Sequence, residues 1–379
     1  MKLAIIKERQ IDEARVAVTP DVVKKLLAMK CQVVIEAGAG MAASYTDEAY
    51  RAAGAEIAPS AEAALKNAEI LWKIHAPTEA ECKMIPANCL VMGILAPYQD
   101  GVLARFNQAK LTAFSMELVP RITRAQTMDV LSSQANLAGY RAVIDAAAVF
   151  GRAFPMMMTA AGTIPPARVL VMGAGVAGLQ AIATARRLGG MVSATDVRLA
   201  TKEQVQSLGA TFVAVENEES RAAETSGGYA KEMSDDYKKL QAALIAETVK
   251  KQDIVICTAL IPGRKAPTLL SKEMIESMKP GSVIVDLAVE QGGNCPLSSV
   301  GKIVDHNGVK ILGYANMPGR VAFDASALYA RNLLAFFTPL VDAKAEGGAK
   351  IKLNLEDEIV KATLLTQNGQ TIHPNFAGK

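Results

Sequence analysis

The segment 169–198 constrains the fold of this chain more than any other stretch, because it sets three glycines between two apolar runs. Gly173, Gly175 and Gly178 follow the first run at the spacing G-x-G-x-x-G. In a strand–turn–helix unit, the first glycine permits a tight turn, the second lets the backbone approach a pyrophosphate, and the third lets the helix pack on its strand. The free N–H groups at the start of that helix attract phosphates. The segment therefore predicts a Rossmann-type dinucleotide site.

Asp196 ends the second apolar run of this segment. A carboxylate about 20 residues after the glycines accepts hydrogen bonds from the adenosine ribose and repels a 2′-phosphate. The sequence therefore favours NAD(H) over NADP(H) as the dinucleotide.

Composition limits the class of protein. With 379 residues, half of them hydrophobic and 21% charged, the chain is typical of a soluble globular protein with two domains. The net charge is only +3, and basic and acidic residues are interspersed, so the sequence shows no basic segment of the kind that binds nucleic acid. The N-terminus is no secretory signal, and no apolar run is long enough for a transmembrane helix. We therefore expect a cytoplasmic protein.

The five cysteines lack C-x-x-C spacing. This pattern favours buried thiols in a reducing compartment over disulfides, and it suggests no zinc or other metal site.

The order of apolar runs and helical patterns predicts an α/β fold with two Rossmann-like domains joined by long helices. The first 120 residues alternate in this way, 135–155 predicts a long connecting helix, and the doubly wound pattern continues after Asp196 until about residue 318. We expect an N-terminal α/β domain over 1–134, completed by 319–379, and a doubly wound parallel sheet that binds NAD(H) over 135–318.

Three further segments give narrower expectations. Met156, Met157 and Met158 are expected to pack between the domains, because methionine fills irregular apolar gaps. The polar segment 216–241 is long for an α/β connection, and it is either a lid or a solvated helical excursion. Asn368 and Gly369 predict a hairpin in the C-terminal tail, docked on the first domain.

The segment 121–133, RITRAQTMDVLSS, with the following QANLAGYRAV, resembles the NAD(H)-binding component (domain I, the alpha subunit) of the proton-translocating nicotinamide nucleotide transhydrogenases. The glycine-rich segment 159–189, DVR at 196–198, GGYAKEM and TALIPGRKAP are similar to that family too. The resemblance covers nearly the whole chain, and RAQTMD is its most specific part.

This resemblance implies direct hydride transfer between NAD(H) on this chain and NADP(H) on a separate partner component, coupled to proton translocation through a membrane component. It implies a homodimer, peripheral on the cytoplasmic face of the inner membrane. The chain has no second fingerprint for NADP(H). We therefore expect the acceptor nucleotide on a partner polypeptide.

The resemblance also assigns cofactor-binding residues. Arg121, with Ile122 and Thr123, would contact the phosphate and ribose side, and Gln126 would hold and turn the nicotinamide ring. Asp129 and Ser132 would anchor the carboxamide and ribose. The remaining assignments lie near the fingerprint: Val176, Asp196, Val197 and Arg198 around the adenosine, Leu260 beneath the cofactor, and Gly228, Tyr229 and Gln241 on a mobile loop hinged at Gly227–Gly228. Without the resemblance, 121–133 would be interpreted as an ordinary surface loop.

Alanine dehydrogenase shares this architecture and supplies the alternative function. Arg15 and Lys73 stand where those enzymes place an arginine and a lysine, but Leu95 replaces their histidine and Glu290 replaces an aspartate. An amino-acid oxidation needs a group that passes protons, and histidine is the usual one; His75 is the remaining candidate. A non-catalytic NAD-binding regulatory module is the third hypothesis.

Overall fold

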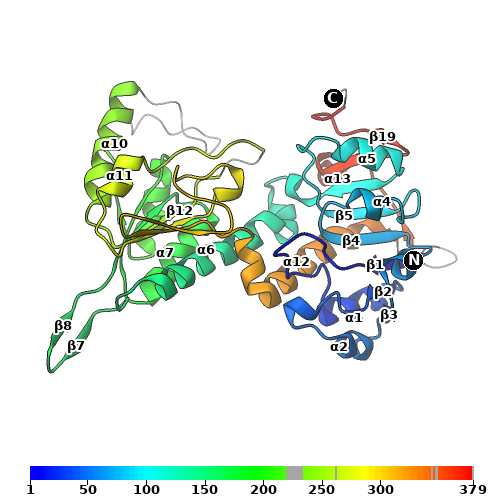
Figure 1. The fold of residues 1–379 in the computed structure, drawn as a ribbon. Helices are drawn as coiled ribbons and strands as arrows, with labels where there is room; N and C mark the ends of the chain where they lie inside the picture. Colours follow the sequence, from blue (N-terminus) through cyan, green and yellow to red (C-terminus); the bar gives the residue numbers. More distant parts are fainter. Residues whose placement is uncertain (218, 220–233, 261–262, 343–344, 346–348, 378–379) are drawn as a thin grey trace. The chain divides into compact units, whose positions relative to one another are not determined.

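The computed structural model describes residues 1–217, 219, 234–260, 263–342, 345 and 349–377. It divides into two compact units (Figure 1). Unit 1 contains Met1–Gln134 and Pro318–Lys379, and unit 2 contains Ala135–Met317. Both units have the α/β architecture that the sequence predicts, so each is described by itself.

Unit 1 is built on a sheet with the strand order β19-β18-β6-β5-β4-β1-β2-β3, parallel from β3 to β6. Its strands are β1 Lys2–Ile5, β2 Gln32–Glu36, β3 Glu56–Ala58, β4 Ile70–His75, β5 Leu90–Ile94, β6 Thr112–Ser115, β18 Leu364–Gln367 and β19 Gln370–Thr371, with a separate pair β16 Val341–Asp342 and β17 Lys350–Ile351. Its helices are α1 Pro20–Ala28, α2 Asp47–Ala52, α3 Ala61–Leu65, α4 Glu79–Cys82, α5 Val102–Gln108, α12 Ala322–Phe337 and α13 Glu358–Thr363.

Alternating side chains of these strands form two cores, one on each face of the sheet. One core packs Ile5, Trp72 and Phe114 against α1, α12 and α13. The other packs Ala4 and Leu71 against α3, α4 and α5. The sheet of unit 1 is therefore covered on both faces, which explains why its strands read as continuous apolar runs.

Unit 2 contains a sheet with the strand order β11-β10-β9-β12-β13-β15-β14. Its strands are β9 Arg168–Met172, β10 Met191–Thr195, β11 Thr211–Phe212, β12 Ile254–Cys257, β13 Val283–Asp286, β14 Ile303–His306 and β15 Val309–Leu312, and β7 Met157–Thr159 and β8 Gly162–Ile164 form a separate pair. Its helices are α7 Val176–Arg187, α8 Lys202–Ser207, α10 Asp235–Val249 and α11 Lys272–Glu276. The helix α6, Val130–Val149, begins five residues before unit 2.

The sheet of unit 2 is doubly wound. One face packs against α6, α7 and α8, and the other packs against α10 and α11. The helix predicted over 135–155 corresponds to α6, which begins earlier, at Val130, and ends earlier, at Val149. Phe150 and Phe154, beyond its end, pack in the core. Gly139 of α6 lies so close to α7 that an added Cβ would stand 2.0 Å from the carbonyl oxygen of Ala177.

The β7–β8 hairpin corrects the expectation for the three methionines. Met156, Met157 and Met158 are exposed by 60%, 44% and 80%, and the hairpin projects from unit 2 (Figure 1). Met157 and Met158 pair with Ile164 and Thr163 of the same hairpin. The prediction of buried packing was wrong because apolar side chains in a projecting hairpin have the same sequence pattern as a buried strand.

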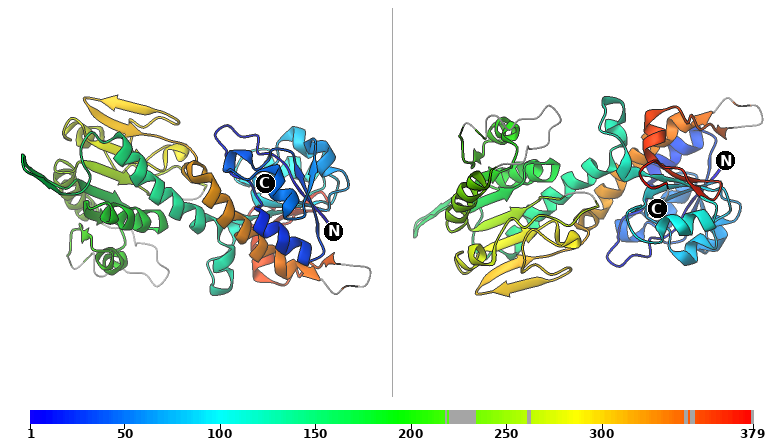
Figure 2. Two further views of the ribbon diagram at one scale, coloured as in Figure 1. Left: turned by 90° about the horizontal axis from the view of Figure 1, so that it is seen from below. Right: turned by 90° about the horizontal axis from the view of Figure 1, so that it is seen from above.

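Two other hairpins complete the sheets. The one predicted at Asn368 and Gly369 is confirmed: β18 pairs with β19 and runs antiparallel to β6 of unit 1. The C-terminal strands, coloured red in Figure 2, are part of unit 1. In unit 2, β14 and β15 pair across Asn307 and Gly308, which have φ of +53° and +82°. The sequence analysis did not predict β14.

Candidate dinucleotide site and a buried ion cluster

The candidate dinucleotide site lies where the strand order of unit 2 reverses. The first strand, β9, pairs with β10 on one side and with β12 on the other. In doubly wound sheets, ligands bind outside the carboxyl ends of the strands at this switch point. The segments that follow these three strands begin at Gly173, Asp196 and Thr258, so the fingerprint and its acid meet at one edge of the sheet.

Each fingerprint glycine has a separate structural reason. Gly173 has a φ of +106°, which disfavours other residues. A Cβ on Gly178 would stand 1.8 Å from the carbonyl oxygen of Gly173. A Cβ on Gly175 would meet nothing within 4 Å. Since protein atoms leave the space at Gly175 open, that glycine fits a requirement that a ligand, and not the fold, imposes.

Thr258 holds the fingerprint turn from the neighbouring strand. Its hydroxyl donates to the carbonyl oxygens of Met172 and Gly173 at 3.2 and 3.1 Å. Asn294, fully buried, then fixes the backbone after Thr258, because its side chain accepts from Ala259 N and donates to Ala259 O. Sequence reasoning missed both residues; their signal is a polar side chain next to an apolar run or a glycine pair.

Asp196 is held by four hydrogen bonds. Its Oδ2 accepts from Ala174 N at 2.7 Å and from an Arg198 Nη2 at 3.0 Å, and its Oδ1 accepts from the N and Nε of Arg198 at 2.8 and 2.9 Å. Burial acts to raise the pKa of Asp196, but the hydrogen bonds from Arg198 and Ala174 outweigh it and lower the pKa. The carboxyl group is therefore ionised near neutral pH, as ribose recognition requires.

Three more predicted residues of unit 2, Val176, Val197 and Leu260, lie in the segments that follow β9, β10 and β12. Val176 is the first residue of α7, and Val176, Val197 and Leu260 are exposed by 41%, 75% and 46%. Gly228 and Tyr229, with the hinge at Gly227, fall outside the described residues. The exposed apolar side chains provide contact area for a ring system.

Gln241 does not lie on a loop, which corrects the sequence expectation. It belongs to α10, where it donates to Thr195 Oγ1 at 3.2 Å and accepts from Val215 N at 2.9 Å. It therefore ties the end of β10 to the segment after β11. The polar composition of 216–241 concealed the start of this helix at Asp235, whose N-cap is Ser234.

The RAQTMD segment belongs to unit 1 and presents polar side chains on a fixed turn. Thr123–Met128 form a 3₁₀ helix whose Ala125 and Met128 are buried. Asn332 of α12 donates to the carbonyl oxygen of Thr127 at 2.8 Å. Arg121, Thr123 and Gln126 are exposed, and Ile122 is half-buried. The core thus holds the backbone while the side chains stay available.

Asp129 and Ser132 are hydrogen-bonded to each other at the start of α6. The carboxylate of Asp129 accepts from the N of Ser132 at 2.8 Å and from its Oγ at 2.5 Å. This is a helix N-cap. The side chains predicted to anchor a carboxamide therefore already have a structural role, and both remain half-buried.

The residues of the alternative function lie in a buried ion cluster of unit 1. Arg15, 5% exposed, donates to both carboxylate oxygens of Glu13 and to Gln134 Oε1 at 2.6 to 2.8 Å. Lys73, 1% exposed, lies 2.9 Å from Glu81 and 3.4 Å from Glu8. The cations that would hold a substrate carboxylate are thus paired with carboxylates of the chain itself.

His75 completes this cluster, with its Nε2 2.6 Å from Glu13 Oε2. Burial acts to raise the pKa of Glu13, but the hydrogen bonds from Arg15 and His75 lower it to about 2. Burial raises the pKa of Glu8. Leu95 is fully buried, and Glu290 accepts from Asn316 N at 3.0 Å. His75, with its side chain 28% exposed, is therefore the one proton-transfer candidate that the alternative function retains among these residues.

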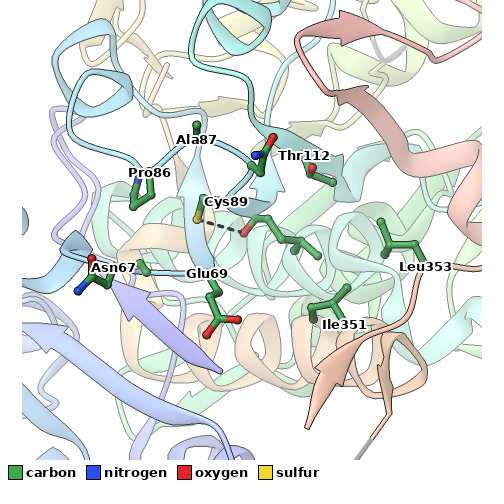
Figure 3. A pocket seen from close by; sticks show the side chains of 11 residues that line it. Asn67, Glu69, Pro86, Ala87, Cys89, Thr112, Ile351 and Leu353 are labelled. Carbon is green, nitrogen blue, oxygen red and sulfur yellow. Dashed lines mark hydrogen bonds between the residues drawn. The ribbon is translucent and has the colours of Figure 1, made fainter. Parts of the chain in front are cut away.

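A cavity of about 440 Å³ lies elsewhere in unit 1 (Figure 3). It is lined by the turns before β4 and β5, including Glu69 and Cys89, by Thr112 at the start of β6, and by Ile351 and Leu353. The turns lie at the amino ends of parallel strands, which is the end opposite to ligand sites in such sheets. The cavity contains no residue predicted for the dinucleotide.

Two properties of the described residues concern membranes and metal ions. No helix among them combines the length and apolar character that a membrane crossing requires. Their His, Cys, Asp and Glu side chains form no group of three suited to a metal ion.

Comparisons with known proteins agree on one family. The model described as "Alanine dehydrogenase/PNT, N-terminal domain" matches residues 4–138, and "Alanine dehydrogenase/PNT, C-terminal domain" matches residues 142–374. The chain is 55% identical to an NAD(P) transhydrogenase alpha subunit chain of Rhodospirillum rubrum over 100% of both chains. It is 31% identical to an alanine dehydrogenase of Methanococcus maripaludis over 85% of this chain and 82% of that one.

A solved structure gives the same result. The chain is similar to the transhydrogenase from Sinorhizobium meliloti with a TM-score of 0.89 and 51% identity, over 98% of this chain and 100% of the other. A solved L-alanine dehydrogenase is similar with a TM-score of 0.80 and 25% identity, over 99% of this chain and 98% of the other. The chain is therefore more similar to these transhydrogenases than to either alanine dehydrogenase.

Proposed function

Because the chain belongs to the family of NAD(P) transhydrogenase alpha subunits, we propose that it is the NAD(H)-binding component of a proton-translocating nicotinamide nucleotide transhydrogenase. The observation that carries the proposal is the fingerprint edge of unit 2. There, open space at Gly175 lies next to the N-terminus of α7, and an ionised Asp196 ends the next strand. This arrangement fits a pyrophosphate and an adenosine ribose.

The chain's own residues bind and orient the dinucleotide. Backbone N–H groups at the start of α7 receive the phosphates, and Asp196 accepts from the ribose. Val176, Val197 and Arg198 surround the adenosine side, and Leu260 lies beneath the cofactor. Gln241 supports this site through its hydrogen bond to Thr195.

Side chains of the 121–132 segment complete the proposed nicotinamide contacts. Arg121, with Ile122 and Thr123, contacts the phosphate and ribose side, and Gln126 orients the ring. Asp129 and Ser132 anchor the carboxamide and ribose. When bound, NAD(H) supplies the hydride at C4 of its nicotinamide ring. The contribution of the protein is orientation, which alone can lower such a barrier by about 7 kcal/mol or more.

The partners follow from the reaction. The acceptor, NADP(H), belongs to a separate component, and a membrane component couples the exchange to proton movement. This chain is then peripheral on the cytoplasmic face of the inner membrane. The R. rubrum relative, which this chain matches over its whole length, is named as a subunit, and that name supports an enzyme divided among several chains.

We extend the proposal to a homodimer. The β7–β8 hairpin exposes Met156, Met157, Met158 and Ile164, and a projecting apolar surface of this kind is suited to burial against a second copy. Sedimentation of the purified chain measures this directly. Substitution of Met156 and Met158 by serine is expected to shift the protein toward monomers.

Direct hydride transfer tests the proposed function. NADPH deuterated at the transferred position, bound to a purified NADP(H)-binding component, is mixed with this chain carrying the acetylpyridine analogue of NAD⁺, whose reduced form absorbs separately. We expect rapid reduction, and deuterium in the product. Gln126→Ala should slow the transfer, while Thr127→Ala, exposed on the same turn, should not.

L-alanine with NAD⁺ is the parallel assay. NADH formation from alanine without exchange between nucleotides would contradict the proposal and support the alanine-dehydrogenase alternative. NADH binding with neither reaction would support a regulatory module. The internal ion pairs of Arg15 and Lys73 lead us to expect no alanine oxidation.

A further inference from the structure

The segment after β10 carries two residues that favour different dinucleotides. Asp196 is the acid that favours the ribose of NAD(H), and Arg198, two residues on, is the residue type that accommodates the 2′-phosphate of NADP(H). Sequence alone cannot decide how they combine. The answer depends on whether the guanidinium is available to a ligand.

The structure shows the two groups paired in a bidentate arrangement. Nε of Arg198 lies 2.9 Å from Oδ1 of Asp196, and an Nη2 lies 3.0 Å from Oδ2. The backbone N of Arg198 donates to the same carboxylate at 2.8 Å. Parallel N–H donors on one carboxylate are a strong, directional form of ion pair. In this state both edges of the Asp196 carboxylate and the fork of Arg198 are engaged.

The burial of the two side chains differs. The Asp196 side chain is 6% exposed, and that of Arg198 is 36% exposed. Asp196 is also tied to the fingerprint turn through Ala174 N at 2.7 Å. The carboxylate is therefore the fixed partner, and the guanidinium is the group that solvent or a phosphate can reach.

We propose that Arg198 is a latent 2′-phosphate-binding residue which Asp196 keeps occupied, so that selection of NAD(H) over NADP(H) depends on this ion pair as well as on repulsion by the carboxylate. The inference rests on the proposed NAD(H) function. A 2′-phosphate that approached this edge would meet a fixed negative charge and a cation already neutralised by it. A ribose hydroxyl carries no charge and meets no such repulsion. It can donate to Asp196 by replacing one of the four donors that now occupy the carboxylate, and the guanidinium is the donor at the surface.

Selectivity of this kind has a purpose in the proposed reaction. Both nucleotides must be present together, and exchange is productive only when NADP(H) stays on the partner component. A chain that accepted NADPH here would occupy its own site with the wrong donor.

The experiment compares the binding of NADPH and NADH to purified full-length variants, by the fluorescence of the reduced nicotinamide. Asp196→Asn removes the charge, keeps an acceptor for Ala174 N and breaks the ion pair with Arg198. We expect the NADPH-to-NADH affinity ratio to rise at least about tenfold, because Arg198 gains a charge-assisted contact with the phosphate. In Asp196→Asn/Arg198→Ala this gain should disappear.

A matched control separates this contact from net charge. Lys202, four residues beyond Arg198, is paired with Glu216 at 2.6 Å. Asp196→Asn/Lys202→Ala has the same net charge as the Arg198 double variant, and it should keep the raised ratio. Competition by 2′,5′-ADP against 5′-AMP should follow the same pattern, because these ligands differ only in the 2′-phosphate.

An equal ratio in both double variants would overturn the inference, since repulsion by Asp196 would then account for the selectivity alone. Thermal unfolding establishes that each variant is folded. Asp196→Ser, tested with the same two second substitutions, replaces Asp196→Asn if the asparagine variant does not fold. A wild-type chain that fails to bind NADH would instead contradict the proposed function, so the two failures are distinguishable.

Discussion

Two charged sites of this molecule use the same chemistry in opposite ways. In unit 2, the Asp196–Arg198 pair stands at a strand end beside the open turn at Gly175, with the Arg198 side chain 36% exposed. In unit 1, the Lys73–Glu81 pair stands on and beside β4, with Lys73 1% and Glu81 4% exposed. A cation at the surface can exchange its partner for a ligand, whereas a buried pair exchanges partners only at a large desolvation cost.

The comparison teaches that residue identity does not decide whether a charged group serves a ligand. Arg15 and Lys73 match a substrate site in sequence, yet their partners are Glu13, Glu81 and Gln134 of the same unit. The edge of unit 2 is suited to a ligand because it has open space at Gly175 and a partly exposed charge at Arg198.

The largest effect is expected from Lys73→Met, which leaves Glu8 and Glu81 buried without their cation. Such a loss costs about 3–5 kcal/mol of unfolding free energy. Trp72, the single tryptophan and fully buried in unit 1, reports the transition by its fluorescence in urea. Lys83→Met, which breaks an exposed pair with Glu79, is the control and should leave the transition unchanged. A stable Lys73→Met protein would show that the cluster is not structural.

Glu13→Gln should lower the unfolding free energy by an amount that depends on pH. A carboxyl whose pKa falls from 4.5 unfolded to about 2 folded stabilises the protein above about pH 5, and this contribution is lost as the pH falls toward 2. The gap between wild type and variant should therefore be about 3 kcal/mol at neutral pH and should narrow below pH 5. Glu8, whose pKa is raised, is present in both proteins. Urea unfolding at several pH values measures the gap; a constant gap would contradict the ion-pair account.

Gly175→Ala should separate binding from folding. Its φ of −77° suits alanine, and the added Cβ meets no protein atom within 4 Å. Stability should change by less than about 0.5 kcal/mol, while NADH affinity should fall about tenfold or more, a loss of at least about 1.4 kcal/mol. Gly151→Ala, where a Cβ also meets nothing within 4 Å, is the matched control and should change neither property.

The smallest effect is expected from Gln241→Ala. It leaves Val215 N and Thr195 Oγ1 without the partner described above, at a cost of about 1 kcal/mol. NADH affinity should weaken only a few-fold, because Asp196 follows Thr195 directly. Lys239→Ala, exposed on the same helix, provides the comparison. A complete loss of NADH binding would assign Gln241 a direct contact instead.

The parts of the fold that could be predicted depend on local sequence. The fingerprint glycines and Asp196 lie within one strand–turn–helix–strand unit, so their spacing indicates their geometry. The hairpin at Asn368–Gly369 has the same local character, and Asn307–Gly308 carries an equal signal that the sequence analysis did not use.

The remainder depends on contacts between distant segments. Thr258 reaches the carbonyl oxygen of Gly173 from 85 residues away, and Gln134 reaches Arg15 from 119. No spacing rule predicts such pairs. The prediction for the methionines at 156–158 was wrong for a different reason, because an exposed apolar hairpin and a buried strand have the same sequence pattern.

NADH titration of Gly175→Ala and Lys73→Met, at a temperature where circular dichroism shows both folded, tests the central contrast most directly. The account predicts weakened binding in Gly175→Ala with normal stability, and wild-type affinity in Lys73→Met despite its lower stability. Wild-type affinity in Gly175→Ala together with lost affinity in Lys73→Met would contradict it, and would place the ligand site at the ion cluster of unit 1.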